Sequence, residues 1–334
     1  MKKGYLMKRD NFVQSIFEKA LIGKQIEFEE AIILIDPRTT QLCDLIQVSN
    51  ILTRRSFGYR IDMCAIYPAK VGLCSGDCAF CSQSAFHKCN VDPVHISELD
   101  ENTIVANAIK LHQLGVGRYS LVTSGEYLTD MEFDRLLGIF QRLKMETEIT
   151  LCASLGTLTP ERAVELKKSG VSRYHHNIET SRSYFPKICS THAYDDKIKT
   201  LNIARQSGLE ICCGGIISMG ETAEQRVEMA FAIKEMNAAC VPINILNPIP
   251  GTRLENQVLL TTDEILRTIA VFRLILQDKP LRFAGGRDKA LGKDEYLGYS
   301  AGINAMIVGN YLTTPGKSFD DEIGNLLRAG FTLR

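Results

Sequence analysis

The spacing of hydrophobic residues changes character near residue 60. Before that point, residues 11–21 and 28–35 repeat apolar side chains every three or four positions, which is the period of an amphipathic helix. Beyond it, short apolar runs alternate with longer helical stretches. We therefore predict an N-terminal helical extension over residues 1–55, followed by an α/β unit over residues 56–334.

The short apolar runs have the length and composition of buried strands. We predict strands at Asp62–Ile66, Arg118–Val122, Glu148–Cys152, Arg173–Ile178, Leu209–Gly214, Val241–Leu246, Leu281–Ala284 and Ala305–Val308. The helical segments fall at about 100–114, 130–145, 160–169, 195–207, 222–237, 262–277 and 289–300. This alternation predicts one parallel (β/α)8 barrel of the TIM type. A doubly wound open sheet is the alternative, but the glycine-rich nucleotide fingerprint that it would more naturally show is missing.

Local signals mark several helix boundaries. Thr159 precedes Pro160, and Thr261 opens another helical run, as capping residues do. Gly115, Gly170 and Gly208 each stand just beyond a helical run, where a left-handed residue ends a helix.

Charge and overall composition exclude several classes of partner. The 334 residues include 39 Lys and Arg and 39 Asp and Glu, so the net charge gives no electrostatic case for nucleic acid or a membrane surface. No apolar run reaches the roughly 18 residues of a membrane span. The basic start lacks the apolar stretch of a secretory signal. We therefore expect a cytoplasmic protein.

The cysteines carry the strongest chemical signal. Eleven cysteines, an odd number without a secretory signal, indicate reduced thiols, metal ligands or redox chemistry. Cys74, Cys78 and Cys81 stand within eight residues, and Gly76 permits a tight bend between them. Such a loop can hold a [4Fe–4S] cluster, and because a cluster normally takes four thiolates, three leave one iron open.

A zinc site and a metal-free loop are the alternatives to this cluster. Zinc would need a fourth ligand, which Cys89 or His87 could supply, and three core cysteines without metal are the second alternative. The spacing Cys-x3-Cys-x2-Cys after the first strand, with Phe80 before the last cysteine, resembles the radical S-adenosylmethionine (SAM) superfamily. The resemblance implies that the open iron chelates SAM, that Phe80 lies near its adenine, and that SAM cleavage yields a radical that abstracts hydrogen from the substrate.

Further segments resemble the biotin synthases, in the same order along the chain. They are residues 174–181, 209–222, 241–244, 250–252, 282–287 and 312–315. The resemblance implies a homodimeric (β/α)8 barrel that inserts sulfur between C6 and C9 of dethiobiotin. The sulfur would come from an auxiliary iron–sulfur cluster, and the electrons from a donor such as flavodoxin or ferredoxin. Unactivated C–H bonds have no acidic proton for a base to remove, so a radical route in a closed site agrees with this chemistry.

The resemblance also assigns binding residues. It places Asn177 and Glu179, where the family usually has Asp, at the SAM ribose and the substrate, and Asn177 with Asn244 at the ureido ring. Thr313 and Thr314 match the loop that takes the substrate carboxylate. Each Asn alone could instead bond backbone at a strand end.

The segment after the second predicted strand is less specific. Ser124, Gly125 and Glu126 follow Thr123 where the superfamily commonly holds the amino group of SAM. A simple turn is an equal alternative.

The auxiliary site departs from the common pattern. In the best-known members three cysteines and one arginine hold a [2Fe–2S] cluster, and Cys152, Cys212 and Arg282 match three of these positions. The fourth falls at Ser120, and a serine hydroxyl is a poor iron ligand at neutral pH. The ordinary site is therefore incomplete.

Other thiols can compensate for that serine. Cys64 stands on the first predicted strand, and alternate barrel strands point side chains into one layer, so Cys64 can meet Cys152 and Cys212. We predict a variant auxiliary cluster, [4Fe–4S] or [4Fe–5S] in type with [2Fe–2S] as the alternative, on these three thiols, with Cys189 a further candidate and Arg282 offsetting charge. A buried apolar thiol is the alternative for Cys64. Cys43, Cys89, Cys213 and Cys240 are interpreted as bystanders.

Two other functions are alternatives for the whole chain. A different radical SAM enzyme, such as a metallocofactor maturase, predicts the first cluster but not the Asn and Thr set. A non-catalytic iron–sulfur or zinc redox sensor predicts metal without SAM cleavage.

Overall fold

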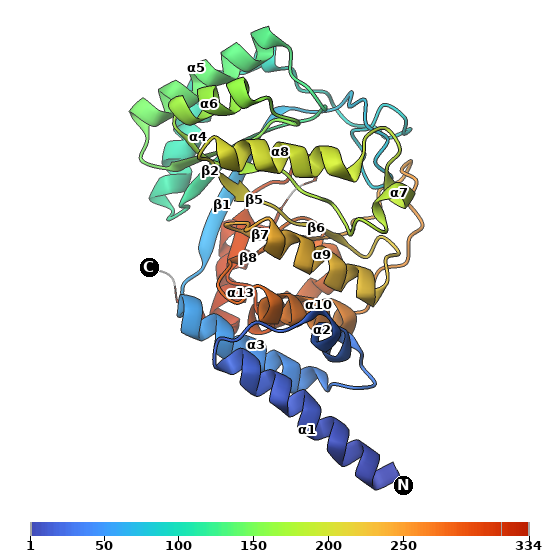
Figure 1. The fold of residues 1–334 in the computed structure, drawn as a ribbon. Coiled ribbons are helices and arrows are strands. Elements are labelled where there is room, and N and C mark those ends of the chain that lie inside the picture. The colour runs from blue at the N-terminus through green and yellow to red at the C-terminus, as the bar shows by residue number, and fades with distance from the viewer. Residues whose placement is uncertain (1, 315, 333–334) are drawn as a thin grey trace.

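A curled sheet of nine parallel strands forms the centre of the molecule (Figure 1). The computed structural model describes residues 2–314 and 316–332, with side chains from Asn11 onward. The strands are β1 (Asp62–Lys70), β2 (Arg118–Thr123), β3 (Thr150–Ser154), β4 (Val171–His175), β5 (Glu210–Cys212), β6 (Gly215–Ile217), β7 (Val241–Ile245), β8 (Leu281–Phe283) and β9 (Ala305–Val308). They are hydrogen-bonded in the order β5-β4-β3-β2-β1-β9-β8-β7-β6.

The two ends of this order are joined by the chain itself. Only Cys213 and Gly214 separate β5, which pairs with β4, from β6, which pairs with β7. Parallel bridges between Glu179 and Gly215 and between Cys212 and Cys240 connect each half to the other neighbour. Counted as one interrupted strand, β5 and β6 give the eight strands of a (β/α)8 barrel, as predicted. The single strand expected at 209–214 is thus divided.

The division occurs where two backbones come very close. A Cβ on Gly214 would lie 1.9 Å from the carbonyl oxygen of Pro242 in β7. Only glycine can occupy this position without moving β7 away from the interrupted strand.

We therefore expect Gly214→Ala to destabilise the fold by about 3 kcal/mol, since overpacking a core forces the backbone to shift. Gly138→Ala is the matched control, because an added Cβ there meets nothing within 4 Å. Gly138 lies in a helix, where alanine is favoured over glycine, so the control variant should be neutral or slightly more stable. Urea unfolding of both variants measures the difference, and equal midpoints would contradict the close approach at Gly214.

Helices cover the outside of the sheet. They are α4 (Glu101–Gln113), α5 (Asp130–Glu146), α6 (Pro160–Lys168), α7 (Phe185–Ile188), α8 (Tyr194–Gln206), α9 (Ala223–Glu235), α10 (Thr262–Ile275), α11 (Arg287–Leu291), α12 (Glu295–Ser300) and α13 (Phe319–Arg328). The predicted caps are confirmed, because Thr159 accepts the backbone N–H of Arg162 and Thr261 forms a capping box with Glu264. The predicted helix-ending glycines at 115, 170 and 208 all have positive φ.

Three helices precede the barrel: α1 (Lys2–Leu21), α2 (Phe28–Ile35) and α3 (Leu42–Phe57). α2 packs on α9, and α3 packs on α10. As a result every residue from Ile265 to Ile275 in α10 is buried. α1 extends away from the barrel at the N-terminal end (Figure 1). The predicted boundary at residue 55 falls within the last turn of α3.

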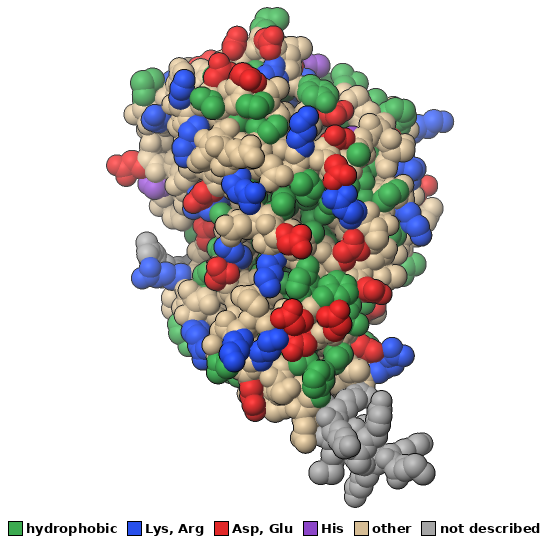
Figure 2. All heavy atoms as spheres, viewed as in Figure 1, with side chains coloured by type: hydrophobic (Ala, Val, Ile, Leu, Met, Phe, Trp, Pro, Cys, Tyr) green, Lys and Arg blue, Asp and Glu red, His purple; other side chains and the backbone are tan. Residues whose placement is uncertain are grey.

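The visible surface carries both signs of charge. Acidic and basic side chains are interspersed over the face that Figure 2 shows, in keeping with equal numbers of each. None of the helices that the structure describes has the length and apolar character needed to cross a membrane.

Candidate active site

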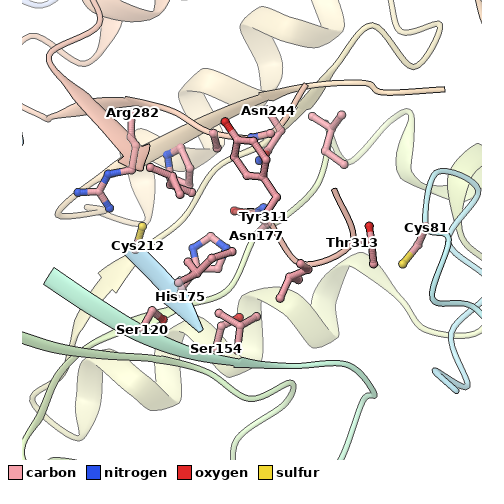
Figure 3. A pocket seen from close by; sticks show the side chains of 18 of the residues that line it. Cys81, Ser120, Ser154, His175, Asn177, Cys212, Asn244, Arg282, Tyr311 and Thr313 are labelled. Carbon is pink, nitrogen blue, oxygen red and sulfur yellow. The ribbon is translucent and has the colours of Figure 1, made fainter. Parts of the chain in front are cut away.

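Inward-facing side chains enclose a cavity of about 390 Å³ inside the barrel (Figure 3). Successive side chains on a strand point to opposite faces, so every second residue reaches the cavity. On β4 and its continuation these residues are Arg173, His175, Asn177 and Glu179. The same alternation supplies the lining from the other strands.

The three-cysteine loop follows β1 at the mouth of this cavity. Phe80 and Cys81 line the cavity, and Cys74 and Cys78 are half-buried in the same loop. The backbone N–H of Cys81 donates to the carbonyl of Cys78 over 3.0 Å, which holds the loop in a tight turn. Burial raises the pKa of Cys81 to about 11. The Cys81 thiol therefore ionises at neutral pH only beside a cation, and three thiols on one compact loop fit an iron–sulfur cluster.

The residues proposed as a fourth zinc ligand have other partners. His87 Nδ1 lies 2.8 Å from the carbonyl oxygen of Cys81, and the Cys89 thiol donates to the carbonyl of Pro250 over 3.3 Å. Among the residues that the structure describes, neither joins the loop thiols in a metal-binding group. This arrangement favours the cluster over a zinc site completed by those two residues.

The three thiols predicted for the auxiliary cluster line the same cavity. Cys64 on β1, Cys152 on β3 and Cys212 on β5 come from alternate strands, and Arg282 on β8 completes the layer. Burial raises the pKa of Cys152 to about 12 and also raises the pKa of Cys64, so these two thiols ionise only beside a cation.

The charges around these thiols fit an anionic metal cluster. The guanidinium of Arg282 is 3% exposed and pairs with Asp62 over 2.6 Å, yet its Nε has no hydrogen-bond partner among the described residues. Arg173 pairs with Glu210 over 2.7 Å but leaves its Nη1 similarly unpartnered. Buried donors without partners are costly, and an anion in the cavity would satisfy them. The buried Ser120 hydroxyl beside Cys152 is also unpartnered in the described chain.

Two other cysteines lie where the sequence did not place them. Cys189 lies outside the cavity lining, with its sulfur 3.9 Å from that of Cys78. The structure therefore does not bring Cys189 together with Cys64, Cys152 and Cys212. Cys240, interpreted as a bystander, is fully buried and forms a parallel backbone bridge with Cys212. It precedes the predicted strand by one residue, so the alternation of side chains along that strand does not predict which way its thiol points.

The two asparagines present their amide N–H groups as donors. The Oδ1 of Asn177 accepts the backbone N–H of Gly214 over 3.1 Å, and that of Asn244 accepts the backbone N–H of Gly285 over 3.0 Å. Because both oxygens are already used, each Nδ2 retains a hydrogen for a carbonyl oxygen in the cavity that both residues line. Asn244 also donates to the carbonyl of Gly215 over 3.2 Å.

The remaining predicted binding residues divide into two groups. Thr313 lines the cavity mouth, where the Ser82 hydroxyl donates to it over 3.4 Å, whereas Thr314 lies outside the lining. Ser124, Gly125 and Glu126 lie at a bend of the chain outside the lining, and the Ser124 hydroxyl donates to the carbonyl of Gly72 over 2.7 Å. Their role toward SAM stays a prediction.

The cavity residues that the sequence analysis did not assign include Arg173, His175 and Tyr311. Burial lowers the pKa of His175, which keeps the imidazole neutral. Arg173 and His175 could have been found, because they alternate with Asn177 on a predicted buried strand. Tyr311 follows the last strand, and the ring lies over the buried guanidinium of Arg287, which also bonds Glu295 and Glu322.

Comparisons with known proteins agree with this geometry. Residues 71–233 match the radical SAM superfamily, and residues 242–332 match the biotin and thiamin synthesis associated domain. Biotin synthase from Acetivibrio thermocellus is 49% identical over 311 residues, covering 93% of this chain and 96% of that protein. Biotin synthase from Carboxydothermus hydrogenoformans is 42% identical, covering 97% and 99%.

Solved structures show the same fold at lower identity. The crystal structure of methylornithine synthase has a TM-score of 0.81 at 16% identity, covering 96% of this chain and 97% of that one. The FeFe-hydrogenase maturase of Carboxydothermus hydrogenoformans has a TM-score of 0.79 at 17% identity, covering 98% and 80%. At such identity the likeness extends to the fold and not to the activity.

The barrel and the three-cysteine loop after its first strand define a radical SAM enzyme, which uses a [4Fe–4S] cluster and SAM. Identity of 49% over nearly the whole length shows more than the superfamily. The chain belongs to the biotin synthase family.

Proposed function

We propose that this chain converts dethiobiotin into biotin by radical SAM sulfur insertion. One observation carries the proposal: a single cavity has the cluster loop at its mouth, three thiols with Arg282 in its interior, and two amide donors in its lining. A substrate held between the two sets of thiols can meet a radical source on one side and a sulfur source on the other. Incubating the reduced, reconstituted protein with SAM and dethiobiotin tests this.

The products separate the possible functions. Both 5′-deoxyadenosine and biotin support the proposal. 5′-Deoxyadenosine alone would indicate a different radical SAM enzyme, and neither product would indicate a redox sensor.

Each set of residues has its own task. When bound, the two iron–sulfur clusters and SAM supply one-electron chemistry at unactivated C–H bonds and the sulfur atom. Cys74, Cys78 and Cys81 hold the first cluster, with Phe80 beside the adenine. Asn177 and Glu179 bind the SAM ribose, and Ser124, Gly125 and Glu126 its amino group. The auxiliary cluster is held by Cys64, Cys152 and Cys212, while Thr313 and Thr314 take the substrate carboxylate.

The backbone supports the carboxylate of Glu179. This residue has a φ of +68°, which is uncommon for a side chain other than glycine. Its carbonyl accepts the N–H of Ile216 over 2.7 Å, and a Cβ on Gly215 would lie 2.5 Å from that carbonyl oxygen. The hydrogen bond to Ile216 and the close approach that Gly215 permits therefore hold Glu179 at the edge of the cavity.

Asn244 is expected to contribute directly to substrate affinity. A buried urea carbonyl without a donor costs about 1–3 kcal/mol, so Asn244→Ala should weaken dethiobiotin binding about tenfold. Asn244→Asp keeps an oxygen that accepts the Gly285 N–H but removes both amide hydrogens, including the one donated to the carbonyl of Gly215, and adds a negative charge, so it should weaken binding at least as much. Calorimetric titration measures both dissociation constants. Unchanged affinity in either variant would argue against this contact.

Assembly and electron supply extend the proposal. The enzyme works as a homodimer, which light scattering of the purified protein can test. Its electrons come from a low-potential carrier such as flavodoxin or ferredoxin. Residues 1–55 form an extension that braces the barrel of residues 56–334, since α2 and α3 pack on α9 and α10.

A further inference from the structure

The side chain of Tyr311 belongs to the cavity wall but has no task in the proposed chemistry. The residue follows β9 and lines the same cavity as Asn177 and Asn244. In the view of Figure 3 its ring projects toward the part of the cavity that the two asparagines occupy, with the hydroxyl on the side of Asn244. That hydroxyl makes no hydrogen bond to any other residue that the structure describes. A polar group therefore faces the substrate space with its hydrogen-bonding capacity unused.

The ring is supported on one face by a buried cation. The guanidinium carbon of Arg287 lies 5.8 Å from the centre of the Tyr311 ring, within cation–π range. Arg287 is itself fixed, because its Nε donates to Glu295 over 2.9 Å and its Nη2 donates to the carbonyl of Ile307 over 3.0 Å. The backbone N–H of Tyr311 donates to the carbonyl of Thr314 over 3.0 Å. The phenol is thus presented to the cavity in a fixed position.

A cyclic urea bound in this cavity has groups that the asparagines do not satisfy. Its carbonyl oxygen accepts hydrogen bonds, whereas its two N–H groups donate them. The Oδ1 atoms of Asn177 and Asn244 already accept backbone N–H groups, so the two amides face the cavity as donors. They suit the urea carbonyl, and the N–H groups need acceptors of their own. A buried N–H group without an acceptor weakens binding.

We propose that the Tyr311 hydroxyl accepts a hydrogen bond from one ureido N–H of dethiobiotin and so makes the site specific for a cyclic urea. The inference rests on the proposed function, which puts dethiobiotin in this cavity. A phenol oxygen accepts a hydrogen bond while its own proton turns to another partner. The asparagines then recognise the carbonyl, and Tyr311 recognises the neighbouring N–H. A site built around such a polar group discriminates strongly against an analogue that lacks it.

Calorimetric titration of the full-length reconstituted protein with dethiobiotin tests the proposal, with SAM present and the clusters oxidised. Tyr311→Phe keeps the ring over Arg287 and removes only the hydroxyl, so the dissociation constant should rise about tenfold. Affinity for SAM alone and iron per chain should stay at the wild-type values. Tyr194→Phe is the matched control, because the Tyr194 hydroxyl also lacks a partner in the described chain but lies outside the cavity lining. Its affinity for dethiobiotin should not change.

Two analogues identify the N–H group that Tyr311 contacts. They are the cyclic carbamates in which one or the other ureido N–H of dethiobiotin is replaced by oxygen. One of them should bind the wild type and Tyr311→Phe equally well, because the donor that it lacks is the partner of the hydroxyl. The other should still bind the variant about tenfold more weakly than the wild type. Variant and analogue together form a double-mutant cycle, which isolates this one contact.

Two results would overturn the inference. An unchanged dissociation constant for dethiobiotin in Tyr311→Phe would show that the hydroxyl makes no contact with the substrate, and Tyr311→Leu gives the same comparison if phenylalanine disturbs the fold. Equal losses for dethiobiotin and both carbamates would show that the hydroxyl does not recognise a ureido N–H. A wild-type protein that binds SAM but not dethiobiotin would instead contradict the proposed function itself.

Discussion

Cys78→Ala is expected to abolish SAM cleavage while the barrel stays folded. The cluster needs all three loop thiolates, since a three-thiolate site has no spare ligand to lose. Cys78 belongs to a half-buried loop at the cavity mouth, so its loss leaves the strand ladder of the barrel intact. 5′-Deoxyadenosine formation, iron per chain and circular dichroism of the anaerobically reconstituted variant measure the three expectations.

Cys89→Ala is the matched control for this prediction. Cys89 lies shortly after the loop, but its thiol bonds the carbonyl of Pro250, so its removal should leave iron and SAM cleavage unchanged. Loss of metal in Cys89→Ala would revive the zinc alternative. Unaltered 5′-deoxyadenosine in Cys78→Ala would reject radical SAM chemistry for the chain.

The barrel could be predicted because its signals are local. Thr159, Thr261 and the helix-ending glycines act within a few residues of themselves, and buried strands keep an apolar run wherever they pair. The division of the strand after Leu209 could not be predicted. It depends on the contact of Gly214 with the carbonyl of Pro242, which lies in a different strand.

The site could be predicted in part for a similar reason. Alternation within strands and the layering of barrels brought Cys64, Cys152 and Cys212 to one cavity. The position of Cys189 could not be predicted in this way. It depends on the hydrogen bonds that Asp77 accepts from the segment after α7, and no sequence periodicity encodes such a contact. Cys240 stands just before its strand, where the direction of a side chain follows the loop rather than the pleat.

Cys64→Ala should remove the auxiliary cluster and leave the loop cluster in place. Cys64 shares its layer with Cys152, Cys212 and Arg282, whereas Ser120 offers only a hydroxyl that ionises with difficulty. The variant should still cleave SAM but make no biotin, because the radical formed on dethiobiotin would find no sulfur. Iron and sulfide per chain, with biotin yield, measure this.

Ser120→Ala provides the comparison that makes the test decisive. The Ser120 hydroxyl is buried and has no hydrogen-bond partner in the described part of the chain, so its removal leaves no protein group unpaired. If thiols alone hold the auxiliary cluster, this variant should keep most of its iron and its biotin yield. Cys213→Ala, another buried thiol that does not line the cavity, controls for the loss of any core sulfur. Full iron and yield in Cys64→Ala together with their loss in Ser120→Ala would make the serine a ligand and Cys64 an ordinary core thiol.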